Sequence, residues 1–242
     1  MSSSIGTPPA TVQEVQPVPI RDNDKQASDL CNKWVDRGLT QNPAIQFLMK
    51  HLIDLGCAPP DRFIRCVKCP SPQAGGFGMV EDDTDQTRSN SAAACDGPIM
   101  KSFQEALEAE QKNGAGSIKI KPEIFLCQQY LENEIMAHKT LVHELIHAID
   151  MCRTKMDPLH NCVHLACTEI RAEHLSGECS FIKELARMKQ FTGHGAECVK
   201  RRALLSVKAN PQCTARAEEY VNAAFPRCYQ DLYPYDRHPN QK

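Results

Sequence analysis

Apolar positions recur at three- and four-residue spacing in several parts of this chain, which predicts a mainly helical protein. The longest such run covers residues 132–151, which contain no glycine or proline. Its apolar stripe consists of Ile135, Leu141, Val142, Leu145, Ile146 and Ile149. Two helices are expected within 29–56, separated by Asn42-Pro43 and ended by Gly56. Further helices are predicted at 163–175, 181–191, 196–208 and 214–225.

Strand signals are fewer. Residues 118–127 alternate between apolar and polar positions and then turn apolar, which predicts a strand. Because Pro122 has no backbone N–H to donate to a neighbouring strand, this strand is expected at the edge of a sheet. Residues 57–80 carry Gly75-Gly76-Phe77-Gly78 and are expected to form a loop leading into a short strand. The fold class is therefore predicted to be α+β, mainly helical, with a small edge sheet.

Two segments lack such patterns. Residues 1–28 are rich in Ser, Pro, Val and Gln and are expected to form a disordered N-terminal tail. Residues 81–117 are polar and are expected to be an insertion, mostly surface loop. Residues 29–242, this insertion included, are expected to fold as a single domain.

Composition narrows the class of protein. The 242 residues carry 28 Lys and Arg against 30 Asp and Glu, a net charge of −2, so we expect no nucleic-acid partner. No apolar run approaches the roughly 18–20 residues of a membrane span, so any membrane contact is expected to be peripheral. The 13 cysteines are many for a reduced cytosolic enzyme, which indicates an oxidising compartment or thiol-bound metal. The N-terminal residues have neither the apolar segment of a secretory signal nor the Arg-rich, acid-poor character of a mitochondrial presequence.

The chemistry is concentrated in His143-Glu144-Leu-Ile-His147, in the middle of the best helix. Histidines at i and i+4 lie on one helix face, so both can bind one zinc ion, while Glu144 can accept a proton from an attacking water. A chain of this composition contains such a motif by chance only about 0.02 times. The sequence thus predicts a zinc hydrolase with His143 and His147 as metal ligands and Glu144 as the catalytic base.

The third zinc ligand is less evident. Asp150 lies on the far side of the same helix, so it is expected to support the ligands rather than bind metal. The next acidic or histidine positions are Asp157, His160, His164, Glu169, Glu173 and His174. Glu169 has half-buried neighbours on a separate helix and would need a partner such as zinc, whereas Glu173 is expected on a solvated face. Candidates for the group that stabilises the oxyanion are His174, His194 and Tyr220, and nothing in the sequence ranks them.

Two motif blocks carry a family resemblance: Thr140-Leu-Val-His143-Glu144-Leu-Ile-His147-Ala-Ile-Asp150 and His164-Leu-Ala-Cys167-Thr-Glu169-Ile-Arg171-Ala. They resemble the mitochondrial inner-membrane metalloprotease family that matures and assembles ATP synthase. The resemblance implies a zincin-like core and a zinc endopeptidase held peripherally on the intermembrane-space side of the inner membrane. It also implies Glu169 as the third ligand and His164 as a supporting residue. The implied protein substrates are the precursor of an ATP synthase subunit in the proton-conducting sector and soluble intermembrane-space proteins.

The same resemblance leaves a second function open. The protein would assist assembly of the proton-conducting sector, and in this alternative it is mainly an assembly chaperone with a dispensable protease site.

Ten cysteines coincide with the family pattern and could form up to five bridges, stapling the N-terminal part of the domain. These are Cys31, Cys57, Cys66, Cys69, Cys127, Cys152, Cys167, Cys179, Cys198 and Cys228. Cys95, Cys162 and Cys213 fall outside the pattern and are expected to be the surplus that makes the total odd. For Cys66-x-x-Cys69 a structural disulfide is favoured over half of a zinc site or a redox pair. Oxidative trapping in the intermembrane space would explain import without a presequence.

Overall fold

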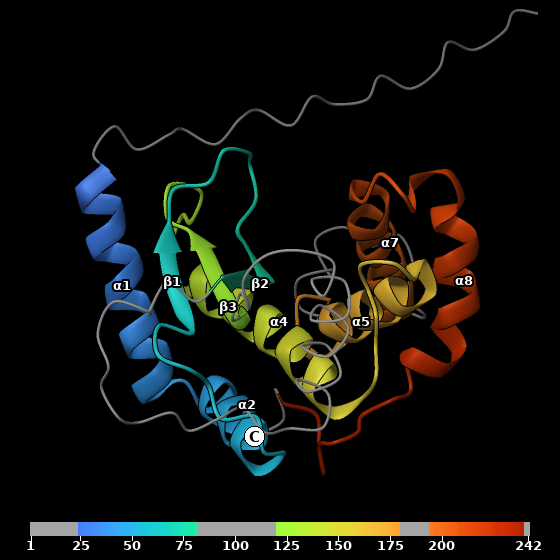
Figure 1. Cartoon of the computed structure of the whole chain (residues 1–242), viewed down its shortest axis with the longest axis horizontal. Helices are drawn as coiled ribbons and strands as arrows, with labels where there is room; N and C mark the ends of the chain where they lie inside the picture. Colours follow the sequence, from blue (N-terminus) through green and yellow to red (C-terminus); the bar gives the residue numbers. More distant parts are fainter. Residues whose placement is uncertain (1–23, 82–119, 180–193, 240–242) are drawn as a thin grey trace, which may run out of the picture.

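A computed structural model describes residues 24–81, 120–179 and 194–239 of the chain (Figure 1). Most of the expected tail, most of the insertion and the helix predicted at 181–191 lie outside these residues. The division into a tail and a single domain at residue 29 stays a prediction. Helix α1 begins at Asp24, five residues before the predicted helix start.

The described helices are α1 Asp24–Gln41, α2 Pro43–Asp54, α4 Glu134–Arg153, α5 Cys162–Leu175, α7 His194–Ala209 and α8 Ala217–Cys228, with a 3₁₀ turn at Thr214–Arg216. Three of them begin in the same way. Asn42, Asn133 and Asn161 each accept hydrogen bonds from backbone N–H groups of the first turn of α2, α4 and α5. Gly56 and Gly177, both with positive φ, follow the ends of α2 and α5, and Gly56 was predicted to end its helix.

In the described residues, three strands form one small sheet: β1 Ile64–Val67, β2 Gly75–Glu81 and β3 Ile120–Cys127, in the order β1-β3-β2. The prediction that residues 118–127 form an edge strand is wrong, because β3 pairs with β1 in parallel and with β2 antiparallel. Pro122 is tolerated because pairing with β1 begins only at Ile124, opposite Ile64, so the sheet has just two strands at Pro122.

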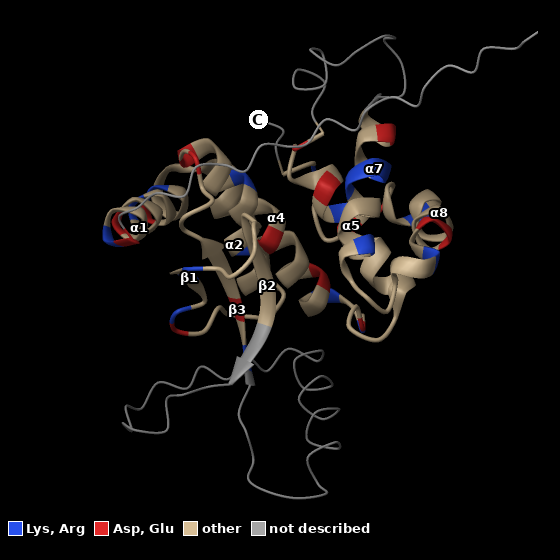
Figure 2. Cartoon of the chain, turned by 90° about the horizontal axis from the view of Figure 1, so that it is seen from above, with Lys and Arg blue, Asp and Glu red and all other residues tan. Residues whose placement is uncertain are grey.

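Helix α4 lies in the middle of the molecule and packs against α1, α2, α5, β2 and β3. In Figure 2, α1, α2 and the sheet lie on one side of it, and α5, α7 and α8 on the other. The predicted apolar stripe of α4 is buried from Leu141 to Ile149, but Ile135 in the first turn is 67% exposed. The fold is thus α+β and mainly helical with a small sheet, and α4 has more buried residues than any other helix in the described part of the chain.

The six disulfides between described cysteines divide into two groups. Cys31–Cys66, Cys57–Cys152 and Cys69–Cys127 join elements from α1 to α4, and Cys162–Cys213, Cys167–Cys228 and Cys179–Cys198 join elements from α5 to α8. The expectation that Cys162 and Cys213 are surplus is wrong, because they pair with each other. Both cysteines of the Cys-x-x-Cys motif are in disulfides, but with different partners. The stapling therefore extends well beyond the N-terminal part.

Among the described helices, none combines the length and the hydropathy of a membrane-spanning segment.

Candidate metal centre and active-site cleft

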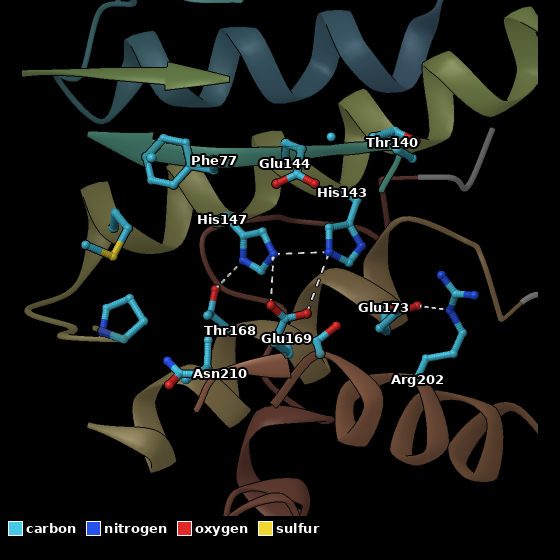
Figure 3. Close-up of a pocket in the computed structure, with 18 of the residues that line it drawn as sticks. Phe77, Thr140, His143, Glu144, His147, Thr168, Glu169, Glu173, Arg202 and Asn210 are labelled. Atoms are coloured by element: carbon cyan, nitrogen blue, oxygen red, sulfur yellow. Dashed lines mark hydrogen bonds and ion pairs between the residues drawn. The ribbon is translucent and has the colours of Figure 1, made fainter. Parts of the chain in front are cut away.

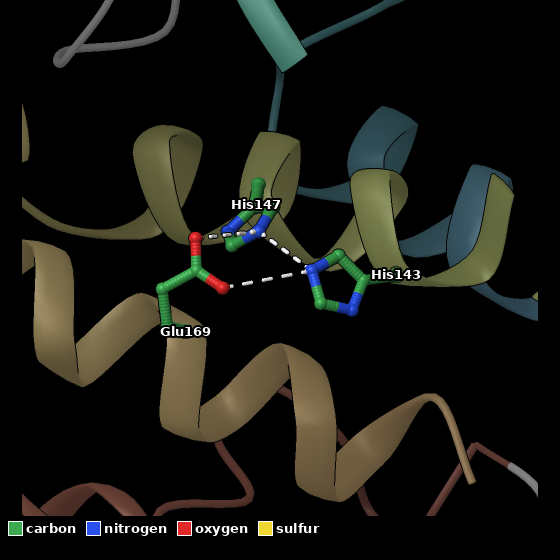
Figure 4. A group of neighbouring side chains, drawn as sticks. All are labelled: His143, His147 and Glu169. Carbon is green, nitrogen blue, oxygen red and sulfur yellow. Dashed lines mark hydrogen bonds and ion pairs between the residues drawn. The ribbon is translucent and has the colours of Figure 1, made fainter. Parts of the chain in front are cut away.

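Three of the predicted site residues meet where α4 crosses α5. His143 and His147 lie one turn apart on α4, and Glu169 faces them from α5 (Figure 4). The two Nε2 atoms are 3.1 Å apart. The Glu169 carboxylate places one oxygen 3.8 Å from Nε2 of His143 and the other 3.7 Å from Nε2 of His147.

The donor set fits zinc. Zinc binds nitrogen and carboxylate oxygen at about 2.0–2.2 Å in tetrahedral sites, which requires donors separated by about 3.3–3.5 Å. The observed separations of 3.1, 3.7 and 3.8 Å bracket that range. The Glu169 Oε2 atom is buried and has no hydrogen-bond partner among the described residues, a costly state for a carboxylate oxygen unless a cation joins it. His143, His147 and Glu169 can therefore hold one metal ion.

The three side chains line a cleft of about 450 Å³ between the two groups of elements (Figure 3). One wall is β2, including Gly75 and Phe77, and the opposite wall comes from α5 and α7. Glu144 lies on the α4 side of the same cleft, between the two histidines in sequence. The cleft thus brings the catalytic candidate Glu144 and the metal candidates to one cavity.

Burial and neighbouring carboxylates perturb the titration of the site. Burial, and then the charges of Glu169, Glu178 and Glu173, raise the pKa of the Glu144 carboxyl well above its usual value. Burial, and then His147 and Arg202, lower the pKa of His143 well below its usual value. His143 is thus neutral near pH 7, as a metal ligand must be.

Glu173 is not on a solvated face, so that prediction is wrong. Its side chain is buried, with the residue 3% exposed, and it accepts a hydrogen bond from Arg202 of α7. Arg202 also donates to Glu178. Burial raises the pKa of Glu173 to about 7 although Arg202 opposes the shift. Figure 3 shows Glu173 directed toward Arg202 rather than toward the histidines.

The remaining candidates lie elsewhere. His160 pairs with Asp157 at 3.1 Å, and His164 accepts a hydrogen bond from the Asp157 backbone, so neither meets the cluster. His174 stacks on Tyr229 with ring centroids 4.3 Å apart. Among the described residues, neither His174 nor Tyr220 lines the cleft, and the His194 side chain is outside the described part.

Sequence reasoning missed Thr168. Its hydroxyl lies 2.8 Å from Nδ1 of His147 and 3.0 Å from Asp150. Asp150, which was expected to support the ligands, is therefore connected to His147 through Thr168. The only signal in the sequence was its position next to Glu169.

Comparisons with known proteins agree with this architecture. The sequence model of the Peptidase M76 family matches residues 29–236 of this chain. The chain is 34% identical to "Mitochondrial inner membrane protease atp23" of Neosartorya fischeri over 222 residues, which cover 89% of this chain and 76% of the relative. It is 32% identical to the protein of the same name from Mycosarcoma maydis, over 85% of this chain and 89% of the relative.

A third relative with that name, from Meyerozyma guilliermondii, is 31% identical over 89% of this chain and 73% of its own length. The search of solved structures found no match. A helical core built around the His-Glu-x-x-His helix, with a small sheet beside it, is consistent with a zincin-like peptidase. The family match covers nearly all described residues, and with it the resemblance seen in the motif blocks is confirmed: the chain belongs to the peptidase M76 family.

Proposed function

We propose that this peptidase is a zinc-dependent endopeptidase in which His143, His147 and Glu169 bind the ion. The observation that carries the proposal is the convergence of three donor atoms from two helices, all within 4.8 Å of one another, on residues that line the cleft. Zinc held there would polarise the scissile carbonyl and lower the pKa of an attacking water.

Glu144 would move the protons. Its carboxylate would accept a proton from the attacking water and then give that proton to the nitrogen of the leaving amine, so the side chain ends in its starting state. A pKa raised by burial makes Glu144 a stronger base than an exposed glutamate once it is ionised.

The substrate would be an extended peptide. β2 is at the edge of the sheet and borders the cleft, and its first residues, Gly75 and Gly76, have no side chains to cover the backbone. A peptide could therefore add to β2 through main-chain hydrogen bonds. Such binding depends little on substrate side chains, which suits an enzyme acting on protein substrates.

Two observations support a proposal for the cellular compartment. Six disulfides are typical of an oxidising compartment. The relatives are named as mitochondrial inner membrane proteases. We therefore propose that the enzyme acts in the intermembrane space, peripherally attached to the inner membrane. The motif resemblance suggests that it cleaves the N-terminal extension of an ATP synthase subunit precursor and assists assembly of the proton-conducting sector.

The test uses the purified protein loaded with zinc and the full-length precursor. Wild type should cleave at one site, and Glu144→Gln should retain zinc while its turnover falls by about 10²–10⁴-fold. Glu134→Gln is the matched control on the same helix, because Glu134 pairs with Arg37 outside the cleft. Cleavage by Glu144→Gln at the wild-type rate would contradict the mechanism. In mitochondria, normal assembly with uncleaved precursor would assign assembly to a separate activity.

A further inference from the structure

A chain of buried polar contacts leads away from the metal centre behind His147. Nδ1 of His147 lies 2.8 Å from the Thr168 hydroxyl oxygen, and that oxygen lies 3.0 Å from Oδ2 of Asp150. Thr168 is 4% exposed and Asp150 is fully buried, so water does not compete for these contacts. Figure 3 shows the Thr168 hydroxyl directed at the His147 ring.

Two arginines determine how Asp150 takes part. Arg171 Nε donates to Oδ1 at 2.8 Å and to Oδ2 at 3.1 Å, and Arg153 Nε donates to Oδ1 at 2.8 Å. A guanidinium group can only donate hydrogen bonds. Two guanidinium partners therefore hold Asp150 as a carboxylate, and both of its oxygens act as acceptors.

The direction of each proton follows. Thr168 has a single hydroxyl hydrogen, and because Asp150 can only accept, that hydrogen is donated to Asp150. The Thr168 oxygen must then accept from His147, so the hydrogen of the neutral imidazole is on Nδ1. The lone pair is left on Nε2, the atom that faces Glu169 and His143.

We propose that Thr168 is a positioning residue of the metal centre. Its hydroxyl donates to Asp150, so its oxygen accepts from Nδ1 of His147 and holds that ring in the Nδ1–H tautomer. The inference rests on the proposed zinc site, since a fixed Nε2 lone pair matters only if that atom binds metal. Zinc-bound histidines commonly donate their other N–H directly to a carboxylate or carbonyl. Here a hydroxyl from α5, the helix that also carries Glu169, stands between the ring and the carboxylate.

The groups that hold the two arginines in place lie far away in the sequence. Arg171 donates to the backbone carbonyls of Asp231 and Tyr233, and Arg153 donates to the Asp231 carboxylate at 2.7 Å. The arginines therefore cannot turn away from Asp150 without losing these bonds. This explains why a 0%-exposed arginine, Arg171, is stable beside the site.

The experiment compares Thr168→Val, Thr168→Ser and the wild type by competition with a zinc chelator at fixed pH. Valine keeps the shape and loses the oxygen, so zinc affinity should fall by about 10- to 100-fold. Serine keeps the hydroxyl and should stay close to wild type. Ser176→Ala is the control, because the Ser176 hydroxyl is buried near the end of the same helix without a hydrogen-bond partner among the described residues. It should leave zinc affinity unchanged.

A second measurement does not depend on any variant folding. In a ¹⁵N-histidine NMR spectrum of the zinc-free wild type, His147 should show a protonated Nδ1 and an unprotonated Nε2. The opposite tautomer, or equal zinc affinity in folded Thr168→Val, would overturn the role of Thr168 while leaving the zinc site intact. A wild-type protein that binds no zinc would instead overturn the proposed function, and this inference with it.

Discussion

The Glu169 carboxylate on α5 lies 3.7 Å from Nε2 of His147 on α4. This contact joins two halves of the molecule that no described disulfide connects, because each of the six bridges lies within 31–152 or within 162–228. A metal ion at this point would therefore hold the two halves together.

Removal of metal should consequently destabilise the protein. A ligand at 100 times its dissociation constant stabilises the folded state by about 2.7 kcal/mol. We expect the melting temperature to fall on treatment with a chelator and to recover on addition of zinc, as measured by calorimetry with the disulfides intact. Identical melting curves with and without chelator would contradict a zinc bridge between α4 and α5.

Gly75 is required where β2 enters the cleft. A Cβ at this position would lie 2.7 Å from the Phe125 carbonyl oxygen and 2.8 Å from Cγ2 of Thr140, so strand β3 or helix α4 would have to shift. Gly75→Ala should lower the free energy of unfolding by about 1–3 kcal/mol in urea titrations. Gly78→Ala is the matched control on the same strand, because its Cβ would meet nothing within 4 Å. Equal stability of the two variants would show that β2 does not pack so closely.

His174 should make stability depend on pH in the acidic range. Burial, and then the charge of His238, lower the pKa of His174 to about 4. Between its ordinary value of about 6.5 and 4, the unfolded chain binds a proton that the folded chain does not, so stability is lost as the pH falls. His174→Gln should reduce this loss, measured as the change in urea midpoint between pH 7 and pH 5. His160→Gln, whose side chain is 69% exposed, should keep the wild-type change. A His174→Gln profile parallel to wild type would refute the assignment.

Whether a feature of the structure can be predicted from the sequence depends on how local its interactions are. His143, Glu144 and His147 could be predicted because helical spacing alone brings the histidines together, and the apolar flanks predict the buried helix. The burial of Glu173 could not be predicted from the sequence, because its partner Arg202 is 29 residues later, on another helix. The central position of β3 also depends on which strands arrive beside it.

Cysteine pairing shows the same limit. Nothing near Cys162 or Cys213 indicates that they are partners, since their sequence separation is 51 and only the packing of α5 beside the end of α7 brings them together. Thr168 is similar, because its role depends on the crossing of α4 and α5 and not on any motif of its own.

The Cys162–Cys213 bridge should contribute substantially to stability. In the chain-entropy account, closing a loop of this length stabilises the folded state by about 4 kcal/mol. Cys162→Ser and the double variant with Cys213→Ser should both unfold at lower temperature than wild type, by similar amounts, in non-reducing calorimetry. A double variant as stable as wild type would mean that this bridge is not formed in solution.

The most direct test of the account is the zinc content of Glu169→Gln compared with Glu173→Gln, measured by elemental analysis after gel filtration. The two glutamates are one turn apart on α5, but only Glu169 faces His143 and His147. Wild type and Glu173→Gln should each carry one zinc per chain, and Glu169→Gln should lose it. Full zinc content in Glu169→Gln, or its loss in a folded Glu173→Gln alone, would contradict the metal centre described above.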